Sequence, residues 1–214
     1  MASDLDGPQF GRDDVDIVKR DSLYQGFFHL QRLDYRHRRY RGDWSPLVRR
    51  EVLYRGEAVG VLLHDPAADM LGLVEQVRPG AIDSQLSPWC LEIVAGIVEP
   101  GESLQEVAHR EMLEEAGSRA LLMQYICEFF PSPGGSDERI HLFYAQTDLG
   151  EVHGSHHGLD EEGEDIQLLV LPVDEVLNNL YGGRFNNANT LITLQWLQLN
   201  RSRLRDEWLR AQAD

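Results

Sequence analysis

The sequence predicts an α/β fold in which helices pack on a largely buried sheet, and three observations support this prediction. Short apolar runs typical of buried strands recur along the chain from residue 58 onward. A well-marked helix interrupts them at Leu104–Ala116. A second long helix, at 188–210, closes the chain and carries a broad apolar face, which has to be buried against the sheet.

Two segments are expected to differ in structure. Residues 1–56 are strand-rich, with alternating stretches at 30–40 and Val48–Tyr54 and a turn signal at Arg41-Gly42-Asp43. Residues 57–214 hold the apolar runs, and strands are predicted at 59–63, 71–77, 90–94, 126–130, 140–145 and 166–171. A short helix should follow Pro172. We therefore expect a small β-rich N-terminal domain at 1–56 and an α/β domain at 57–214.

The helix at Leu104–Ala116 has signals at both ends. Ser103 followed by Glu106 forms a capping box, in which each side chain satisfies a free backbone N–H of the first turn. Gly117 stands where a left-handed residue ends a helix. These signals fix the helix boundaries.

Composition excludes several classes of protein. The chain has 36 acidic against 20 Lys and Arg residues, a net charge of −16, which argues against nucleic-acid and anionic-membrane partners. No apolar run reaches the roughly 18 residues of a membrane span, and residues 1–6 lack the pattern of a signal peptide. We expect a cytoplasmic protein in which Cys90 and Cys127 are buried free thiols.

Three glutamates share the apolar stripe of the predicted helix. Glu111, Glu114 and Glu115 fall within an arc of about 100° on a helical wheel. The same arc holds the apolar residues Leu104, Val107 and Ala108. Because like charges at positions i and i+4 repel, a divalent cation would relieve the repulsion, and an all-oxygen donor set selects Mg²⁺ or Mn²⁺. The alternative, a solvated glutamate-rich face, would keep the glutamates away from the apolar stripe.

A metal held by an acidic helix indicates phosphate chemistry, because the cation neutralises phosphate oxygens and orients an attacking water. Arg110 lies beside the glutamates in sequence, on the other side of the helix, where it would orient Glu102 or another carboxylate. An ordinary surface ion pair is the alternative.

A second acidic segment is the predicted loop of about 18 residues at 148–165, long enough to suggest a function. It carries the carboxylates Asp160, Glu161, Glu162, Glu164 and Asp165. A mobile acidic surface loop is the alternative. The residues alone do not distinguish Glu161 from Glu162 as a candidate base.

The pattern Gly96-x5-Glu102-x7-Arg110-Glu111-Met112-x-Glu114-Glu115-x-Gly117 resembles the signature of the Nudix hydrolases. Ser118 departs from it, because an aliphatic residue is usual there. The resemblance implies an α/β/α sandwich around a mixed sheet, and hydrolysis of a nucleoside diphosphate linked to another moiety.

Nearly the whole chain resembles the bacterial ADP-ribose pyrophosphatases of that family, through phrases such as Tyr24-Gln25-Gly26-Phe27-Phe28, Glu75-Gln76-Val77-Arg78 and Ser132-Pro133-Gly134-Gly135. That resemblance implies Mg²⁺-dependent cleavage of ADP-ribose into AMP and ribose 5-phosphate, with two or more metal ions per site and Mn²⁺ able to substitute. It also implies a homodimer with exchanged N-terminal segments.

The resemblance also implies roles for individual residues. The metal ligands are the Ala95 carbonyl oxygen, Glu111, Glu115 and Glu164, with Glu162 as general base. Glu102, Arg110 and Glu114 support these ligands. Substrate contacts are expected from Phe27, Arg50, Glu51, Arg55, Arg78, Ile97, Ser132, Gly134 and Glu138.

The residues also allow other interpretations. Phe27 could belong to the core, and Arg50 and Arg55 could be solvated strand residues or dimer ion pairs. The planar guanidinium of Arg78 suits a diphosphate, and its place before Pro79 puts it at a strand end. The substrate could instead be GDP-mannose or ADP-glucose, and a non-catalytic ADP-ribose-binding module is a further alternative.

Overall fold

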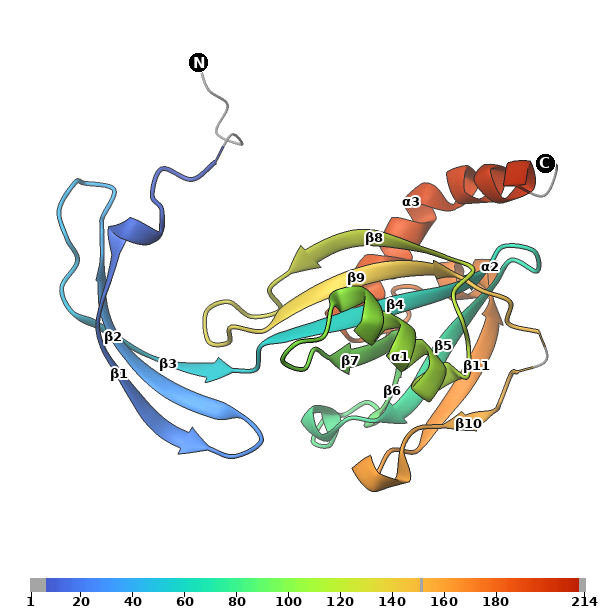
Figure 1. Ribbon diagram of the computed structural model, residues 1–214, viewed down its shortest axis with the longest axis horizontal. Coiled ribbons are helices and arrows are strands. Elements are labelled where there is room, and N and C mark those ends of the chain that lie inside the picture. Colours follow the sequence, from blue (N-terminus) through green and yellow to red (C-terminus); the bar gives the residue numbers. More distant parts are fainter. Residues whose placement is uncertain (1–6, 151, 212–214) are drawn as a thin grey trace, which may run out of the picture. The chain divides into compact units, whose positions relative to one another are not determined.

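The computed structural model describes residues 7–150 and 152–211, without the side chain of Glu162. The chain forms two compact units (Figure 1). The first comprises the described residues up to Gly56 together with Phe130–Glu138, and the second comprises Glu57–Phe129 and the chain from Arg139 onward. Phe130–Glu138 therefore packs with the N-terminal segment, although it lies far along the chain.

The first unit is a three-stranded antiparallel sheet in the order β1-β2-β3, preceded by the short 3-10 turn Arg12–Asp14. Its strands are β1 (Val15–Gln25), β2 (His29–His37) and β3 (Val48–Tyr54). β3 has the predicted bounds, and β2 ends at His37, before the predicted limit of residue 40. β1 was not predicted as a strand, because its side chains are mostly exposed and lack regular alternation of apolar and polar residues.

The second unit is built on an eight-stranded mixed sheet whose main path runs β10-β11-β5-β4-β9-β8. β4 and β9 are parallel neighbours, and the other pairs are antiparallel. Its strands are β4 (Glu57–Asp65), β5 (Met70–Val77), β6 (Trp89–Glu92), β7 (Val94–Ile97), β8 (Leu122–Phe129), β9 (Arg139–Gln146), β10 (His156–His157) and β11 (Ile166–Pro172).

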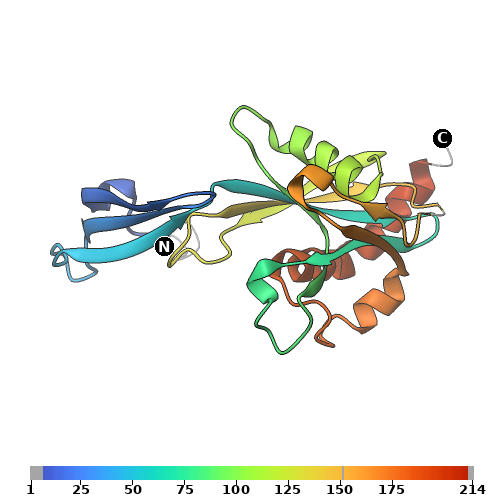
Figure 2. The same cartoon turned by 90° about the horizontal axis from the view of Figure 1, so that it is seen from below.

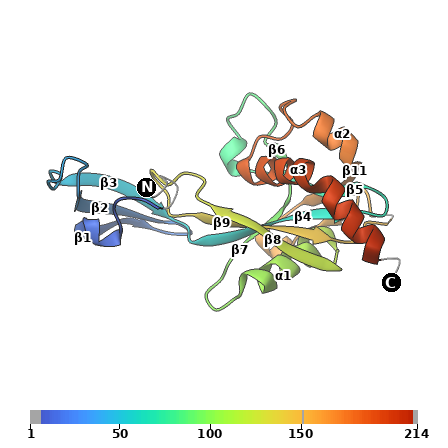
Figure 3. The ribbon, with the colours of Figure 1, turned by 90° about the horizontal axis from the view of Figure 1, so that it is seen from above.

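Helices cover both faces of this sheet. Helix α1 (Leu104–Ala116) packs on one face, while α2 (Val173–Asn178) and α3 (Ala188–Ala211) pack on the other (Figures 2 and 3). Each face has its own apolar core: Val107 and Met112 of α1 belong to one, and Leu194 and Leu197 of α3 to the other. The predicted α/β/α sandwich with a β-rich N-terminal part is confirmed.

Two central strands separate at one end of the sheet. β4 and β5 pair with each other only over 63–65 and 70–72. Beyond that point β5 pairs with β6 and β4 pairs with β7, so the chain crosses the opening at Ile93. The predicted single strand at 90–94 is therefore wrong, because the backbone N–H of Ile93 leaves the sheet and donates to Thr190 Oγ1 (3.1 Å).

The ends of α1 are as predicted. Ser103 and Glu106 form the reciprocal capping box, and Gly117 adopts the left-handed conformation with φ 57°. The next residue, Ser118, is buried and contacts Thr147 Oγ1 through its hydroxyl (2.5 Å). This hydrogen bond satisfies the polar side chain at the position where Nudix sequences usually carry an aliphatic residue.

The prediction of buried free thiols is confirmed for Cys90, whereas Cys127 is less buried than predicted. Both cysteines are free, with Cys90 buried and Cys127 half-buried. In the part of the chain that the structure describes, no helix is both long and apolar enough to cross a membrane.

Candidate active site

Among the predicted site carboxylates whose side chains the structure describes, Glu115 is the most buried. Its side chain is 2% exposed, although it belongs to a helix that faces solvent on its other side. The backbone N–H of Ala95 donates to Oε2 (2.9 Å), and Gln76 Nε2 donates to Oε1 (3.2 Å). Burial raises the pKa of Glu115 to about 8, and the nearby Glu111 charge adds to this effect. The arrangement suits a carboxylate that receives a cation.

Glu111 lies one helical turn before Glu115 and packs directly against Gly96 on β7. A Cβ atom on Gly96 would lie 1.7 Å from Glu111 Oε1 and 2.0 Å from its Cδ, so only glycine leaves room for this carboxylate. Burial raises the pKa of Glu111 to about 7, while Arg110 opposes the shift. The backbone of β7, the strand before α1, thus packs directly against the carboxylates of Glu111 and Glu115.

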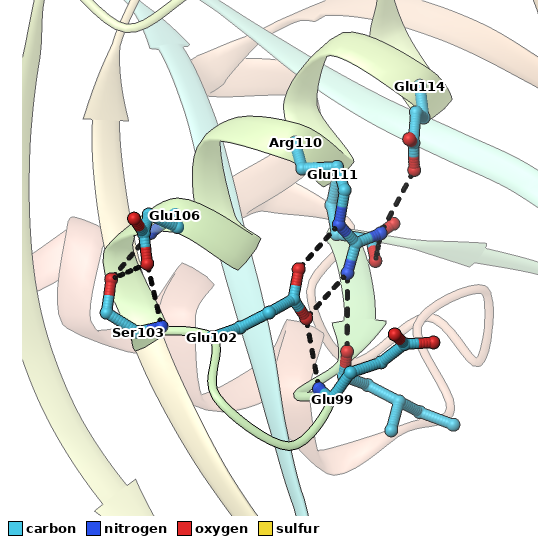
Figure 4. A network of polar contacts seen from close by, with 8 residues as sticks. Glu99, Glu102, Ser103, Glu106, Arg110, Glu111 and Glu114 are labelled. Carbon is cyan, nitrogen blue, oxygen red and sulfur yellow. Dashed lines mark hydrogen bonds and ion pairs between the residues drawn. The ribbon is translucent and has the colours of Figure 1, made fainter.

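Arg110 joins the carboxylates around the helix (Figure 4). Its Nη1 lies 2.7 Å from Glu111 Oε1 and 3.1 Å from Glu114 Oε2. Its Nε and Nη2 donate to Glu102 at 3.2 and 3.3 Å, and Nη2 also approaches the Ile97 carbonyl oxygen (3.4 Å). Although partial burial lowers the pKa of Arg110, these carboxylates raise it above its ordinary value.

The structure therefore brings Glu102, Arg110, Glu111 and Glu114 into one network. Glu102 also accepts from the backbone N–H of Glu99 (3.0 Å), and this bond together with Arg110 lowers its pKa. Although Arg110 was placed on the opposite side of the helix from the predicted ligands, its long side chain reaches Glu111 and Glu114. The contact joins Arg110 to Glu111, whose side chain is only 11% exposed.

The acidic segment at 148–165 is attached to the C-terminal end of α1. Gly158 N–H donates to the Glu114 carbonyl oxygen (3.2 Å), and the His157 ring lies so close to Gly117 that a Cβ there would be 2.9 Å from Cε1. The segment is not an uninterrupted loop as predicted. It contains β10, which pairs with β11, and the 3-10 turn Asp160–Glu162.

The carboxylates predicted in this segment differ in burial. Glu164 is half-buried, accepts from Leu159 N–H (3.3 Å), and lies near enough for its charge to raise the pKa of Glu111. Asp160 and Glu161 are exposed. The backbone of Glu162 ends the 3-10 turn, and its side chain lies outside the described part of the structure.

Arg78 and Glu92 form an ion pair close enough to Glu115 for its charge to act on Arg78. Arg78 follows β5, and its Nε donates to Glu92 Oε2 on β6 (2.6 Å). Burial lowers the pKa of Arg78, but Glu92 and Glu115 more than offset this effect and raise it. Sequence reasoning did not select Gln76 or Glu92. The available signal was strand alternation, which places Gln76 on the same face as Arg78.

The donor set fits a hard divalent cation. Glu111 and Glu115 supply carboxylate oxygens from α1 beside β7, where the Ala95 N–H donates to Glu115, and burial makes two adjacent carboxylates costly without a counter-charge. Among the described residues, no three His, Cys, Asp or Glu side chains gather closely enough to hold a metal ion by themselves. Glu164 is thus near this pair without closing a three-carboxylate cluster.

The remaining predicted substrate residues belong to the first unit, apart from Ile97, whose side chain is partly exposed on β7. Phe27 is 83% exposed and packs edge-on against Phe28, which excludes its assignment to the core. Arg55 lies over the Phe28 ring (4.7 Å) and pairs with Glu138 (3.2 Å).

Within the same unit, Arg50 and Glu51 are exposed on β3, and Arg50 Nη1 donates to the Arg49 carbonyl oxygen (2.7 Å). Ser132 and Gly134 are exposed in the Phe130–Glu138 segment, where the Ser132 carbonyl oxygen accepts from Gly135 N–H (3.1 Å). The structure thus brings Arg55 and Glu138 together and leaves the other side chains open to solvent.

A strand–loop–helix that buries paired glutamates against a glycine inside an α/β/α sandwich defines a class of protein, and residues 54–193 match the model of the NUDIX domain. The chain belongs to the Nudix family and is a Nudix hydrolase.

Several characterised proteins are similar over almost their full length. The ADP-ribose pyrophosphatase of Escherichia coli K12 is 42% identical over 199 residues, covering 93% of this chain and 95% of the relative. The ADP-ribose pyrophosphatase of Haemophilus influenzae is 42% identical, covering 94% of each. The GDP-mannose pyrophosphatase of Cronobacter sakazakii is 31% identical, covering 86% and 95%.

A solved structure described as an ADP compounds hydrolase has a TM-score of 0.64 and covers 93% of this chain and 96% of that one. At 21% identity it shows the fold alone.

Proposed function

We propose that this protein hydrolyses the diphosphate of ADP-ribose to AMP and ribose 5-phosphate with Mg²⁺. The observation that carries the proposal is the pair Glu111 and Glu115, buried against β7 in a chain whose 42%-identical relatives are ADP-ribose pyrophosphatases. A buried acidic pair of this kind is retained for a cation and would otherwise destabilise the fold.

The proposed ligands of the cation are the Ala95 carbonyl oxygen, Glu111, Glu115 and Glu164. The bound ions, two or more Mg²⁺ with Mn²⁺ as a possible substitute, would neutralise the diphosphate and lower the pKa of an attacking water. Arg110 holds Glu111 in place, and it is in turn fixed by Glu102 and Glu114.

Other side chains have the proposed roles of general base and of substrate contacts. Glu162 is the proposed base, taking a proton from water while the water oxygen bonds to one phosphorus and the bridging P–O bond breaks. Arg78, fixed by Glu92, would hold a phosphate with its planar guanidinium. Phe27 is the proposed stacking surface for the adenine. Proposed further contacts are Arg50, Glu51, Arg55, Ile97, Ser132, Gly134 and Glu138.

A second candidate substrate is another nucleoside diphosphate sugar, because GDP-mannose pyrophosphatases are also similar over most of the chain. The test is a panel of ADP-ribose, GDP-mannose, ADP-glucose and NADH, assayed with Mg²⁺, with Mn²⁺ and with EDTA, with the products identified. We expect the highest kcat/KM for ADP-ribose and no turnover in EDTA. Higher kcat/KM for GDP-mannose would select the second substrate, and binding without turnover would indicate a non-catalytic module.

The location, the oligomeric state and the domain boundaries of the enzyme are proposed as well. We infer a cytoplasmic homodimer in which residues 1–56 form a β-rich domain exchanged between subunits and 57–214 form the catalytic domain, without nucleic-acid or membrane partners. The exposed apolar side chains of the first unit, among them Val18, Tyr24 and Phe27, support an interface there. Sedimentation equilibrium of the full chain should give twice the monomer mass, and a monomer would contradict this proposal.

A further inference from the structure

Gln76 is a buried polar residue on the face of the sheet that supports α1. It lies on β5 two residues after Val74, which belongs to the core beneath α1, so strand alternation turns Gln76 toward the same helix. The residue is 6% exposed. A glutamine in such a place is unfavourable unless its amide finds a partner.

The partner of this amide is Glu115. Gln76 Nε2 donates to Oε1 at 3.2 Å, while Ala95 N–H donates to Oε2 at 2.9 Å. The two donors come from β5, one of the separated central strands, and from β7, which pairs with the other one, β4. Each carboxylate oxygen is therefore held from a different strand, which fixes the rotation of the carboxylate about its Cγ–Cδ bond.

At residue 76, a neutral amide suits the proposed metal site better than a cationic or an aliphatic side chain. A lysine or arginine at residue 76 would neutralise Glu115 and compete with a cation for its oxygens. An aliphatic side chain would leave Oε1 without a donor in a nearly dry environment. An amide orients the carboxylate and leaves its negative charge available.

We propose that Gln76 is the positioning residue that orients Glu115 for a divalent cation and so sets the affinity of the site for that cation. The inference rests on the proposed metal-binding role of Glu115. Gln76 touches neither metal nor substrate in this proposal, and it acts only through Glu115. Hydrogen-bond partners that orient a ligand typically change metal affinity by about 10- to 100-fold.

The test measures binding of Mn²⁺ to the full chain without substrate, using the electron paramagnetic resonance signal of free Mn²⁺. Gln76→Met keeps the length of the side chain and removes the donor, and we expect its Mn²⁺ affinity to fall about 10-fold or more. Thr193→Val is the matched control. It removes a buried hydroxyl that donates to Asn189 O (2.9 Å) on α3, on the opposite face of the sheet, and should bind Mn²⁺ like the wild type.

A double-mutant cycle separates positioning from a general loss of stability. In the Glu115→Gln background, Gln76→Met should produce no further loss of Mn²⁺ affinity, because the group it orients is gone. Equal losses in both backgrounds would overturn the proposal, as would a Gln76→Met affinity within about twofold of the wild type. If circular dichroism shows that Gln76→Met is unfolded, Gln76→Asn, whose amide is too short to reach Oε1, replaces it in the same cycle.

The outcomes also separate this inference from the proposed function. Tight Mn²⁺ binding that depends on Gln76, in a protein that does not hydrolyse ADP-ribose, would retain the positioning role and reject the substrate. Metal-dependent hydrolysis of ADP-ribose with Mn²⁺ binding indifferent to Gln76 would do the reverse.

Discussion

A Cβ atom on Gly96 would lie 1.7 Å from Oε1 of Glu111, so the glycine that precedes the helix in sequence and the glutamate in its third turn occupy adjoining space. The relationship explains why a glycine is needed at this position without invoking an unusual backbone angle. The backbone of β7 must approach α1 closely enough for Ala95 and the two glutamates to meet.

Gly96→Ala should therefore inactivate the enzyme while leaving most of the fold intact. The new methyl group would displace the Glu111 carboxylate and not the backbone, and a misplacement of about 1 Å can cost about 100-fold in rate. The measurement is kcat/KM for ADP-ribose together with the thermal midpoint. Gly11→Ala, where a Cβ would meet nothing within 4 Å, is the control and should keep wild-type kinetics. Wild-type turnover in Gly96→Ala would reject the proposed arrangement.

Glu162→Gln and Glu115→Gln should fail in different ways. Loss of the proposed base should reduce kcat by about 100-fold or more and leave Mn²⁺ affinity close to that of the wild type. Loss of a ligand should reduce both kcat and Mn²⁺ affinity. Steady-state kinetics and Mn²⁺ titration of both variants, measured side by side, distinguish the two roles. Near-wild-type turnover in Glu162→Gln would remove Glu162 as the base, and Glu161 would be tested next.

Ser103→Ala should lower stability with little effect on the chemistry. Ser103 Oγ accepts from Glu106 N–H (3.3 Å), and the Glu106 carboxylate accepts from Ser103 N–H (2.9 Å), so the substitution removes half of the capping box. An N-cap of this kind is worth about 1 kcal/mol. Urea denaturation should show this loss, and Ser103→Asp, which can still cap the helix, should restore it. A denaturation midpoint unchanged in Ser103→Ala would contradict the prediction.

Local chemistry explains what could be predicted from the sequence. The bounds of α1 follow from Ser103, Glu106 and Gly117, because caps act within a few residues of the helix end. The burial of Glu111 and Glu115 follows from their place in the apolar stripe of the helix. The spacing between Gly96 and these glutamates was instead recognised through its resemblance to the Nudix signature.

What could not be predicted depends on contacts between segments distant in sequence. Gln76 meets Glu115 across 39 residues, and no pattern within β5 indicates which helix will cover it. The break at Ile93 arises because Thr190, on α3, captures its N–H. β1 lacks alternation because most of its side chains are exposed, so its pairing with β2 left no periodic signal.

The unfolding free energy of the second unit should fall as the solution is acidified. The cause is His64, a histidine that has no part in the proposed metal site. His64 is buried, and its Nδ1 lies 2.8 Å from the Tyr144 hydroxyl. Burial lowers the pKa of His64, although Asp69, whose Oδ1 lies 3.6 Å from Nε2, partly opposes this shift. Asp65 acts in the same direction as Asp69, and Arg201 acts against them.

The direction of this pH dependence follows from proton uptake on unfolding. Below the ordinary histidine pKa of about 6.5, the unfolded chain binds a proton that the folded chain does not yet accept, so acid favours unfolding. His64→Asn can keep the hydrogen bond to Tyr144 and removes the titrating group. We expect the difference in unfolding free energy between wild type and His64→Asn to shrink as the pH falls from about 7.5 to 5.5. Urea denaturation at both pH values measures this difference, and a constant difference would show that His64 does not contribute to the pH dependence.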